Sequence, residues 1–126
     1  MSIGWGIIGI GRHCDLKIAP AMKSAAETRV IAAFSRDRGR AEAFARKHDL
    51  PAAYDSLNEL LGDSRIDAVY VASPNFLHAH HTQMAAEAGK HVLVEKPMAL
   101  NVNEALEMVN VCRRKGVRLG VGFHLR

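Results

Sequence analysis

The chain of 126 residues has the length of one domain, and its 48% of hydrophobic residues is enough for one packed core. Its apolar runs are far shorter than the roughly 20 residues that cross a bilayer, so no membrane-spanning segment is expected. The formal net charge of +4 is local to the stretch between Arg36 and Lys47, without the longer basic stripe or interleaved aromatic residues of a nucleic-acid-binding surface. We therefore expect neither nucleic acid nor membrane as a partner. The basic cluster is either a solvated helix face or, as its position favours, a pocket for one anionic ligand.

Short apolar runs alternate with longer segments of helical spacing along the chain. The strand-like runs are Trp5–Ile8, Val30–Phe34, Ala52–Tyr54, Ala68–Ala72, Val92–Val94 and Val117–Val121. Most are nearly continuous in apolar residues, as expected for strands that are buried on both faces of a parallel sheet. The alternation predicts one α/β domain over residues 1–126, a Rossmann-type, doubly wound parallel sheet.

The predicted helices have recognisable ends. Ser56 and Asn101 are each followed three residues later by Glu, which is the pattern of a capped helix start. Gly89 and Gly116 each stand between a helical segment and a strand, where a left-handed glycine ends a helix. The first residues lack the basic stretch of a secretory signal, so a cytoplasmic location is expected. In that setting the only two cysteines, in the glycine loop and in the last helix, are expected to be free.

A glycine-rich turn follows the first strand. The register that starts at Gly4 and Gly6 is misleading, because both residues fall inside the strand. The useful register is Gly9-x-Gly11, with Cys14 in place of the third glycine, directly before a helical segment. Gly9 would permit the tight turn, and Gly11 would let backbone approach a pyrophosphate at a helix start. The loop predicts a dinucleotide-binding site.

The end of the second strand bears on which dinucleotide is bound. NAD-binding domains usually place Asp or Glu there for the ribose 2′-hydroxyl. Here Ser35, Arg36 and Arg40 offer a hydroxyl and two guanidinium groups, which suit a 2′-phosphate. Asp37 is the main argument for NAD, and an exposed, Arg-rich helix start is the alternative without a ligand. We predict NADP over NAD.

Two proline-containing turns follow the fourth and fifth strands. Ser73-Pro74-Asn75 ends the fourth strand, and Asn75 is positioned to cap the next helix. Glu95-Lys96-Pro97 ends the fifth strand, and its proline is a candidate for a cis peptide bond, although most such bonds are trans. Together with the glycine loop and Ser35-Arg36, these turns all follow carboxyl ends of strands. Those ends line the crevice in which open α/β sheets bind ligands.

The complete set of motifs resembles the N-terminal domain of the Gfo/Idh/MocA oxidoreductases. The motifs are Gly9-x-Gly11, Ser35-Arg36, Ser73-Pro74-Asn75-x-x-His78, Glu95-Lys96-Pro97 and the closing stretch Gly120–Arg126. The Ser-Arg pair with Arg40 is similar to the NADP-dependent 1,5-anhydro-D-fructose reductases of that family. Order and spacing match over essentially the whole chain.

The resemblance implies a role for each matching residue. The pyrophosphate would contact Gly9, Ile10, Gly11 and Arg12, and the 2′-phosphate would contact Ser35, Arg36 and Arg40. The ribose and nicotinamide region would be lined by the Ala72–Leu77 segment, with Ala72, Ser73, Pro74, Asn75 and Leu77 as cofactor-binding residues. Glu95 would contact the nicotinamide end, and His78 and Gly122 complete the cofactor-binding set. Lys96 would lie beside the reacting carbon as the catalytic residue, where its ammonium group polarises a carbonyl or supports proton transfer.

Members of the family continue into a second α+β domain that supplies the substrate pocket and usually a catalytic histidine. This chain ends at Arg126, so we expect it to bind NADP and to be inactive alone. The parent enzyme would transfer hydride to or from a sugar, a sugar-derived ketone or aldehyde, or a polyol. A non-catalytic dinucleotide sensor is the alternative, and a methyltransferase is a weaker one. The last strand, near Val117–Phe123, is expected to expose apolar side chains and a free edge, and so to favour a homo-oligomer.

Three histidines on one predicted helix raise the question of a metal site. His78 and His81 share a helix face, but no nearby Cys, Asp or Glu completes a ligand set. We therefore predict no metal and interpret these residues and His80 as solvated. His124, just past the last strand, is a further candidate for the substrate side of the site.

Overall fold

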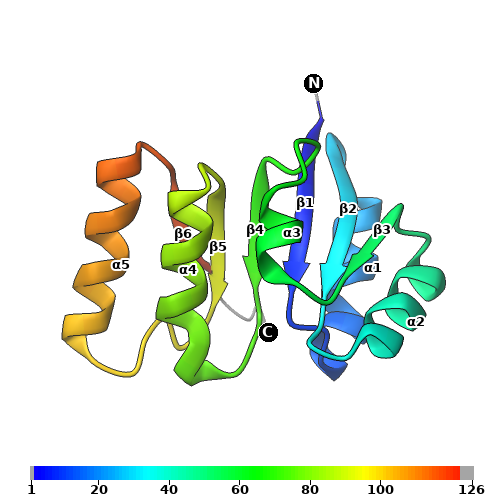
Figure 1. The fold of residues 1–126 in the computed structure, drawn as a ribbon, viewed down its shortest axis with the longest axis horizontal. Helices are drawn as coiled ribbons and strands as arrows, with labels where there is room; N and C mark the ends of the chain where they lie inside the picture. The colour runs from blue at the N-terminus through cyan, green and yellow to red at the C-terminus, as the bar shows by residue number, and fades with distance from the viewer. Residues whose placement is uncertain (1, 123–126) are drawn as a thin grey trace.

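The computed structural model describes residues 2–122, and in this part of the chain all strands belong to one parallel sheet of order β3-β2-β1-β4-β5-β6 (Figure 1). The strands are β1 (Ile3–Ile8), β2 (Thr28–Phe34), β3 (Ala52–Tyr54), β4 (Ala68–Val71), β5 (His91–Glu95) and β6 (Leu119–Gly122). The predicted Rossmann-type parallel sheet is confirmed.

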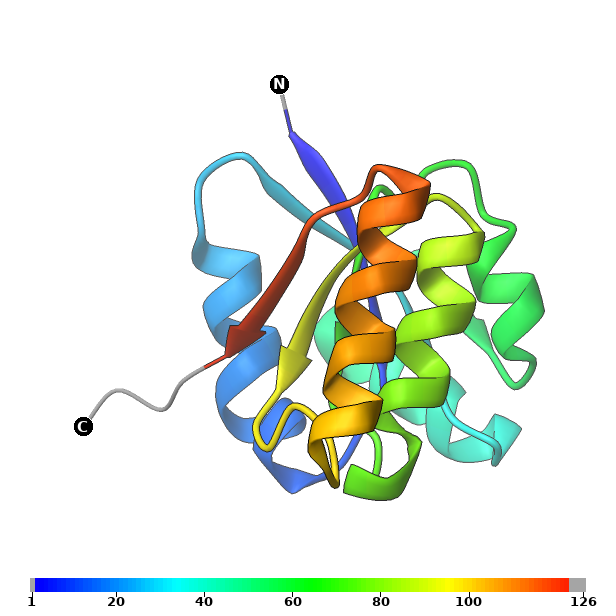
Figure 2. The ribbon, with the colours of Figure 1, turned by 90° about the vertical axis from the view of Figure 1, so that its left-hand side faces the viewer.

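Helices cover both faces of the sheet (Figures 1 and 2). They are η1 (Cys14–Ile18, a π-helix), α1 (Ala19–Ser24), α2 (Arg38–His48), α3 (Leu57–Leu61), η2 (Asn75–Leu77, a 3₁₀ turn), α4 (His78–Glu87) and α5 (Val102–Lys115). Successive side chains of a strand point to opposite faces, so Val69 and Val71 pack with α3, α4 and α5, whereas Tyr70 packs with η1, α1 and α2. The core therefore has two halves, one on each side of the sheet.

Five of the six predicted strands differ from the structure at one end or both. Strands β1 and β2 begin two residues before the predicted runs, β5 extends one residue further at each end, and β6 ends one residue later. Strand β6 begins at Leu119 and not at Val117, because the Val117 N–H closes the end of α5 by donating to the Cys112 carbonyl oxygen (3.0 Å). Strand β4 ends at Val71, one residue early. The apolar pattern could not separate the helix end at Val117 from the strand start at Leu119, since both are apolar and half-buried.

Helix ends follow the predicted chemistry with one exception. The side chains of Ser56 and Asn101 accept hydrogen bonds from the backbone N–H three residues later, at 3.3 and 2.9 Å. Gly89 and Gly116 adopt the left-handed conformation, with φ of 79° and 71°. Asn75 does not cap a helix: it is the first residue of η2, where no side-chain cap is made.

The glycines of β1 are packing residues, as their place inside the strand indicated. A Cβ on Gly4 would lie 2.0 Å from the Arg65 carbonyl oxygen, and one on Gly6 would lie 2.9 Å from a Leu60 methyl carbon. At these two positions, β1 can therefore approach α3 and the α3–β4 connection only if the residue has no side chain. This close packing places the end of β1 beside β4, where the strand order reverses and ligands bind in open α/β sheets.

Residues 2–122 contain no helix that is both long and apolar enough to cross a membrane.

Candidate functional site: a cleft at the carboxyl ends of the strands

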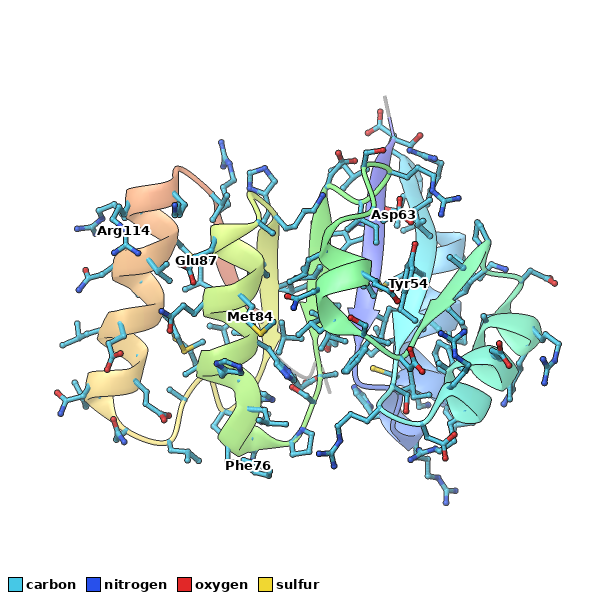
Figure 3. The ribbon with its side chains drawn as sticks, in the orientation of Figure 1. Tyr54, Asp63, Phe76, Met84, Glu87 and Arg114 are labelled. Atoms are coloured by element: carbon cyan, nitrogen blue, oxygen red, sulfur yellow. The ribbon has the colours of Figure 1, made fainter. Side chains whose placement is uncertain are left out.

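A cleft of about 530 Å³ opens at the carboxyl ends of β1, β2 and β4. It is lined by Gly9, Ile10, Gly11, Phe34, Ser35, Arg36, Asp37, Arg40, Ala72, Ser73, Pro74, Phe76, Leu77 and His81. Phe76 lies at this end of the molecule in Figure 3. The cleft thus joins the glycine loop, the turn after β2 and the turn after β4, as their positions in the sequence predicted.

At Gly9 the backbone of the glycine loop packs directly against the turn after β4. The φ of Gly9 is 100°, and a Cβ there would lie 2.6 Å from the Ser73 nitrogen and 2.7 Å from the Ala72 carbonyl group. Gly11 differs, because a Cβ there would meet no atom within 4 Å. Gly9 is therefore required by the fold, whereas the open space at Gly11 is available to a ligand.

Some of the charged residues after β2 are bound to other parts of the chain, and others are free to bind a ligand. Arg38 donates two hydrogen bonds to Asp55, at 3.1 and 3.0 Å. Asp37 caps α2 by accepting from the Arg40 N–H at 3.1 Å, so its carboxylate already has a structural role. For the exposed guanidinium groups of Arg36 and Arg40, no acidic partner lies among residues 2–122.

The donor chemistry of this end of the cleft suits a phosphate group. Two arginines that carry full positive charge can donate bidentate hydrogen bonds to phosphate oxygens. Ser35, which accepts a hydrogen bond from the Asp37 N–H at 3.1 Å, keeps its own hydroxyl proton for a ligand. Asp37, the sequence argument for NAD, is explained here as a helix cap.

A second group of predicted residues lies at the end of β5, outside the cleft lining. The Tyr70 hydroxyl donates a hydrogen bond to the Glu95 carboxylate, and the His13 ring nitrogen lies 3.9 Å from that carboxylate. Burial, followed by the hydrogen bond to Glu95, raises the pKa of Tyr70. Gly122 pairs with Glu95 in the sheet register, and a Cβ there would meet the Tyr70 hydroxyl at 3.7 Å. Lys96 follows directly, with an exposed side chain and a cis peptide bond to the next residue.

The expectation of three solvated histidines on α4 is wrong for two of them. His80 is exposed, but His78 and His81 are only 1% and 7% exposed. The His81 Nδ1 lies 2.8 Å from the Ser73 hydroxyl, and burial, with the charges of His80 and His78, lowers its pKa to about 4. The His78 ring contacts the carbonyl oxygens of Ser73 and Pro97. The two buried rings thus contact the turn after β4, and His78 also contacts the turn after β5.

The helix that follows the glycine loop is anchored from two sides. Cys14 is 1% exposed, and burial followed by the charge of Glu95 raises the pKa of its thiol to about 12. Asp15 accepts hydrogen bonds from Lys47 (2.7 Å) and His48 (2.8 Å), which lower its pKa. Both cysteines are free, as expected.

The structure separates the predicted residues into those that line the cleft and those that do not. Gly9, Ile10, Gly11, Ser35, Arg36, Arg40, Ala72, Ser73, Pro74 and Leu77 line it. Arg12, Asn75, His78, Glu95, Lys96 and Gly122 lie outside the lining. His124 and the rest of the closing motif after Gly122 fall outside the described residues.

Phe34, Asp37, Phe76 and His81 line the cleft although they were not among the predicted cofactor-binding residues. Phe34 could have been found, since it is the last residue of β2. His81 had a weaker signal, its spacing of three from His78, and Phe76 lies inside the Ala72–Leu77 segment that the resemblance assigned to the ribose and nicotinamide region. Within residues 2–122 no three His, Cys, Asp or Glu side chains form a possible metal site.

Residues 3–123 match the family model GFO_IDH_MocA, described as an oxidoreductase family with an NAD-binding Rossmann fold. An oxidoreductase of Rhizobium meliloti is 44% identical over 124 residues, which are 98% of this chain and 37% of that protein. The 1,5-anhydro-D-fructose reductase of Ensifer adhaerens is 39% identical over 122 residues, 97% of this chain and 36% of that protein.

Solved structures give the same assignment. A 3-ketoreductase from Actinomadura kijaniata, in complex with NADP and TDP-benzene in an open conformation, superposes with a TM-score of 0.92 at 33% identity. The match covers 98% of this chain and 39% of that one. The chain thus spans a little over a third of the length of these relatives.

Proposed function

Because the chain belongs to the Gfo/Idh/MocA oxidoreductase family, with its NAD-binding Rossmann fold, we propose that it is the NADP-binding part of a sugar or polyol oxidoreductase. One observation carries the choice of NADP. Arg36 and Arg40 line the cleft after β2, while Arg38 and Asp37 are engaged by Asp55 and the α2 N-terminus. Two positive charges therefore face the position where a 2′-phosphate would lie, and the nearby carboxylate of Asp37 already accepts a hydrogen bond from the helix.

The substrate class is proposed from the relatives. One matching protein is a 1,5-anhydro-D-fructose reductase and another is a 3-ketoreductase, so a sugar-derived ketone is the favoured substrate type. Because the chain spans little more than a third of these relatives, we infer that the substrate pocket lies in the remainder of the parent enzyme. The chain alone then binds NADP without catalysing turnover.

The role proposed for Lys96 follows from its position. Its exposed ammonium group follows β5 directly, next to Glu95, whose carboxylate is held by the Tyr70 hydroxyl. A bound nicotinamide supplies or accepts the hydride. A hydrogen bond from the Lys96 Nζ to the substrate oxygen would polarise a carbonyl and support transfer of a proton to it. An exposed lysine in this position favours an enzyme over a sensor that binds the dinucleotide without chemistry.

Calorimetric titration tests the cofactor assignment. NADPH should bind more tightly than NADH by roughly 1–3 kcal/mol, the range for charged hydrogen bonds to a phosphate. Arg36→Ala should remove most of that difference and leave NADH affinity nearly unchanged. Arg38→Ala is the matched control: it removes an arginine two residues away that is already paired with Asp55, so the preference for NADPH should persist. Equal affinities of the unmodified chain for both cofactors would sink the NADP assignment.

We also propose that the chain self-associates through the edge of β6 and the exposed apolar side chains of α5. This strand is the last of the sheet, and it pairs only with β5 among residues 2–122. The exposed apolar side chains that were predicted for β6 lie mostly on α5 instead. Strand β6 is half-buried, whereas Val102, Leu106 and Val109 of α5 are 73%, 54% and 36% exposed. Unpaired strand edges and exposed apolar patches both favour association.

Light scattering over a concentration series should therefore show a rising mean mass. Leu106→Lys should reduce this rise, and Leu16→Lys, which changes an apolar residue of similar exposure (50%) on η1, should not. A chain that stays monomeric throughout the series would contradict the oligomer proposal and leave the cofactor proposal intact.

A further inference from the structure

His78 connects the two turns that border the proposed cofactor site. It is the first residue of α4, and its side chain is 1% exposed. Its Nε2 lies 2.7 Å from the carbonyl oxygen of Ser73, after β4, and its Nδ1 lies 2.8 Å from the carbonyl oxygen of Pro97, after β5. Ser73 belongs to the cleft lining, and Pro97 directly follows Lys96. One ring thus spans both turns.

The nature of the two partners determines how many protons this ring needs. A carbonyl oxygen accepts hydrogen bonds and cannot donate one. A neutral imidazole has a single N–H, so in either tautomer one bare ring nitrogen would face a carbonyl oxygen at hydrogen-bond distance, on a ring that is 1% exposed. A buried polar contact of that kind is costly. Only an imidazolium, with an N–H on both nitrogens, satisfies both contacts.

The neighbouring His81 provides an internal contrast. Its Nδ1 lies 2.8 Å from the Ser73 hydroxyl, which can donate as well as accept. A neutral ring satisfies that contact, in agreement with the lowered pKa of His81, to about 4. Ser73 is therefore fixed twice, at its carbonyl oxygen by His78 and at its hydroxyl by His81.

We propose that His78 is a positioning residue, held as an imidazolium, that ties the Ser73 turn to the Lys96–Pro97 turn. The proposal rests on the role given to Lys96 in the proposed function. His78 would act on Lys96 through the backbone, by fixing the carbonyl group of the residue that follows it. The cofactor-lining turn and the catalytic turn then move as one unit.

Surrounding charges act in both directions on this ring. Burial and the start of α4 both oppose a positive charge, as do the basic groups of His80 and Lys96. The acidic groups on the neighbouring elements are Glu95 at the end of β5 and Glu104 and Glu107 on α5. The two carbonyl acceptors are the contacts that hold the second proton, because hydrogen bonds from a charged donor are about twice as strong as neutral ones.

Nitrogen NMR of the ring measures the proposed state directly. In the ¹⁵N-histidine-labelled chain near neutral pH and without cofactor, both nitrogens of His78 should show the shift of a protonated nitrogen, and His81 should show one protonated and one bare. Spectra that link each ring to its own backbone assign the signals, so the assignment does not depend on any variant. A bare nitrogen on His78 under these conditions would overturn the proposal. No cofactor is present, so this result is independent of whether NADP is the ligand.

Cofactor binding supplies the second readout. The glutamine of His78→Gln carries both of its N–H groups on one nitrogen, so it cannot place a donor at each turn as the two ring nitrogens do. We expect its NADPH affinity to fall by roughly tenfold, the equivalent of one lost charged hydrogen bond. His80→Gln, the same substitution at an exposed position on the same helix, should bind as the unmodified chain does. A folded His78→Gln chain with full NADPH affinity would contradict the positioning role, and if that variant does not fold, the NMR result decides.

Discussion

Gly9→Ala is expected to destabilise the chain by about 3 kcal/mol or more, the combined cost of a strained left-handed residue and a forced backbone shift. The new Cβ would lie 2.6–2.7 Å from backbone atoms of Ala72 and Ser73, which cannot move aside as a flexible side chain can. Because those atoms belong to the turn that lines the cleft, NADPH binding should be lost as well. Urea denaturation followed by circular dichroism measures the first effect, and titration measures the second.

Gly11→Ala is the matched control for this experiment. The added Cβ would meet no atom of the chain within 4 Å, so the free energy of unfolding should stay close to that of the unmodified chain. NADPH affinity should nevertheless fall by about tenfold or more, since the methyl group occupies the space that a pyrophosphate would enter. Equal stability of both variants would show that the turn at Gly9 can relax, contrary to the geometry found here.

Acid should weaken the fold through His81. Folding lowers the pKa of its ring from 6.5 to about 4, mainly by burial, so the unfolded chain binds the proton more readily than the folded chain. The stability contributed by the neutral ring is complete above pH 6.5 and is lost as the pH falls toward 4. This difference in pKa corresponds to about 3 kcal/mol. Urea denaturation in steps from pH 7 to pH 4 measures the loss.

The variant His81→Gln separates this contribution from other acid effects. Glutamine keeps a hydrogen-bonding group toward Ser73 but does not titrate, so its free energy of unfolding should fall less over the same pH range. His80→Gln removes an exposed histidine and should retain the acid sensitivity of the unmodified chain. If all three chains lose stability in parallel, His81 does not carry the effect.

The fold was largely predictable because its signals are local. Buried parallel strands produce apolar runs such as Val30–Phe34, and helix starts carry their own capping residues, as at Ser56 and Asn101. The π-helix at Cys14–Ile18 was not predictable, because no residue type marks the extra residue in such a turn. The same limit applies to Val117, whose role at a helix end depends on a hydrogen bond and not on its hydrophobicity.

The site was predictable where it consists of turns after strands, and less so where helices contribute. Arg36 and Arg40 could be selected from the sequence by position, but only the Arg38–Asp55 pair shows why the third arginine of that segment is not available. The buried state of His78 and His81 was missed, since a polar residue on a helix is ordinarily exposed unless a partner compensates it. Pro97, one of the partners of His78, lies 19 residues away after β5. Ser73 is only five and eight residues from the two histidines, but nothing in its residue type shows that its carbonyl and hydroxyl groups contact their rings.

The reaction rates of the two buried thiols would measure local opening of the chain. A thiolate is the reactive form of cysteine, and burial raises the pKa of both Cys14, to about 12, and Cys112. An alkylating reagent at neutral pH therefore reacts with either residue only when its surroundings open. Cys14 lies behind the glycine loop, and Cys112 lies between α5 and β6, on opposite faces of the sheet. The alkylation rate of Cys14 therefore measures how often the cofactor end opens, and that of Cys112 measures how often the β6 edge opens. No engineered label is needed.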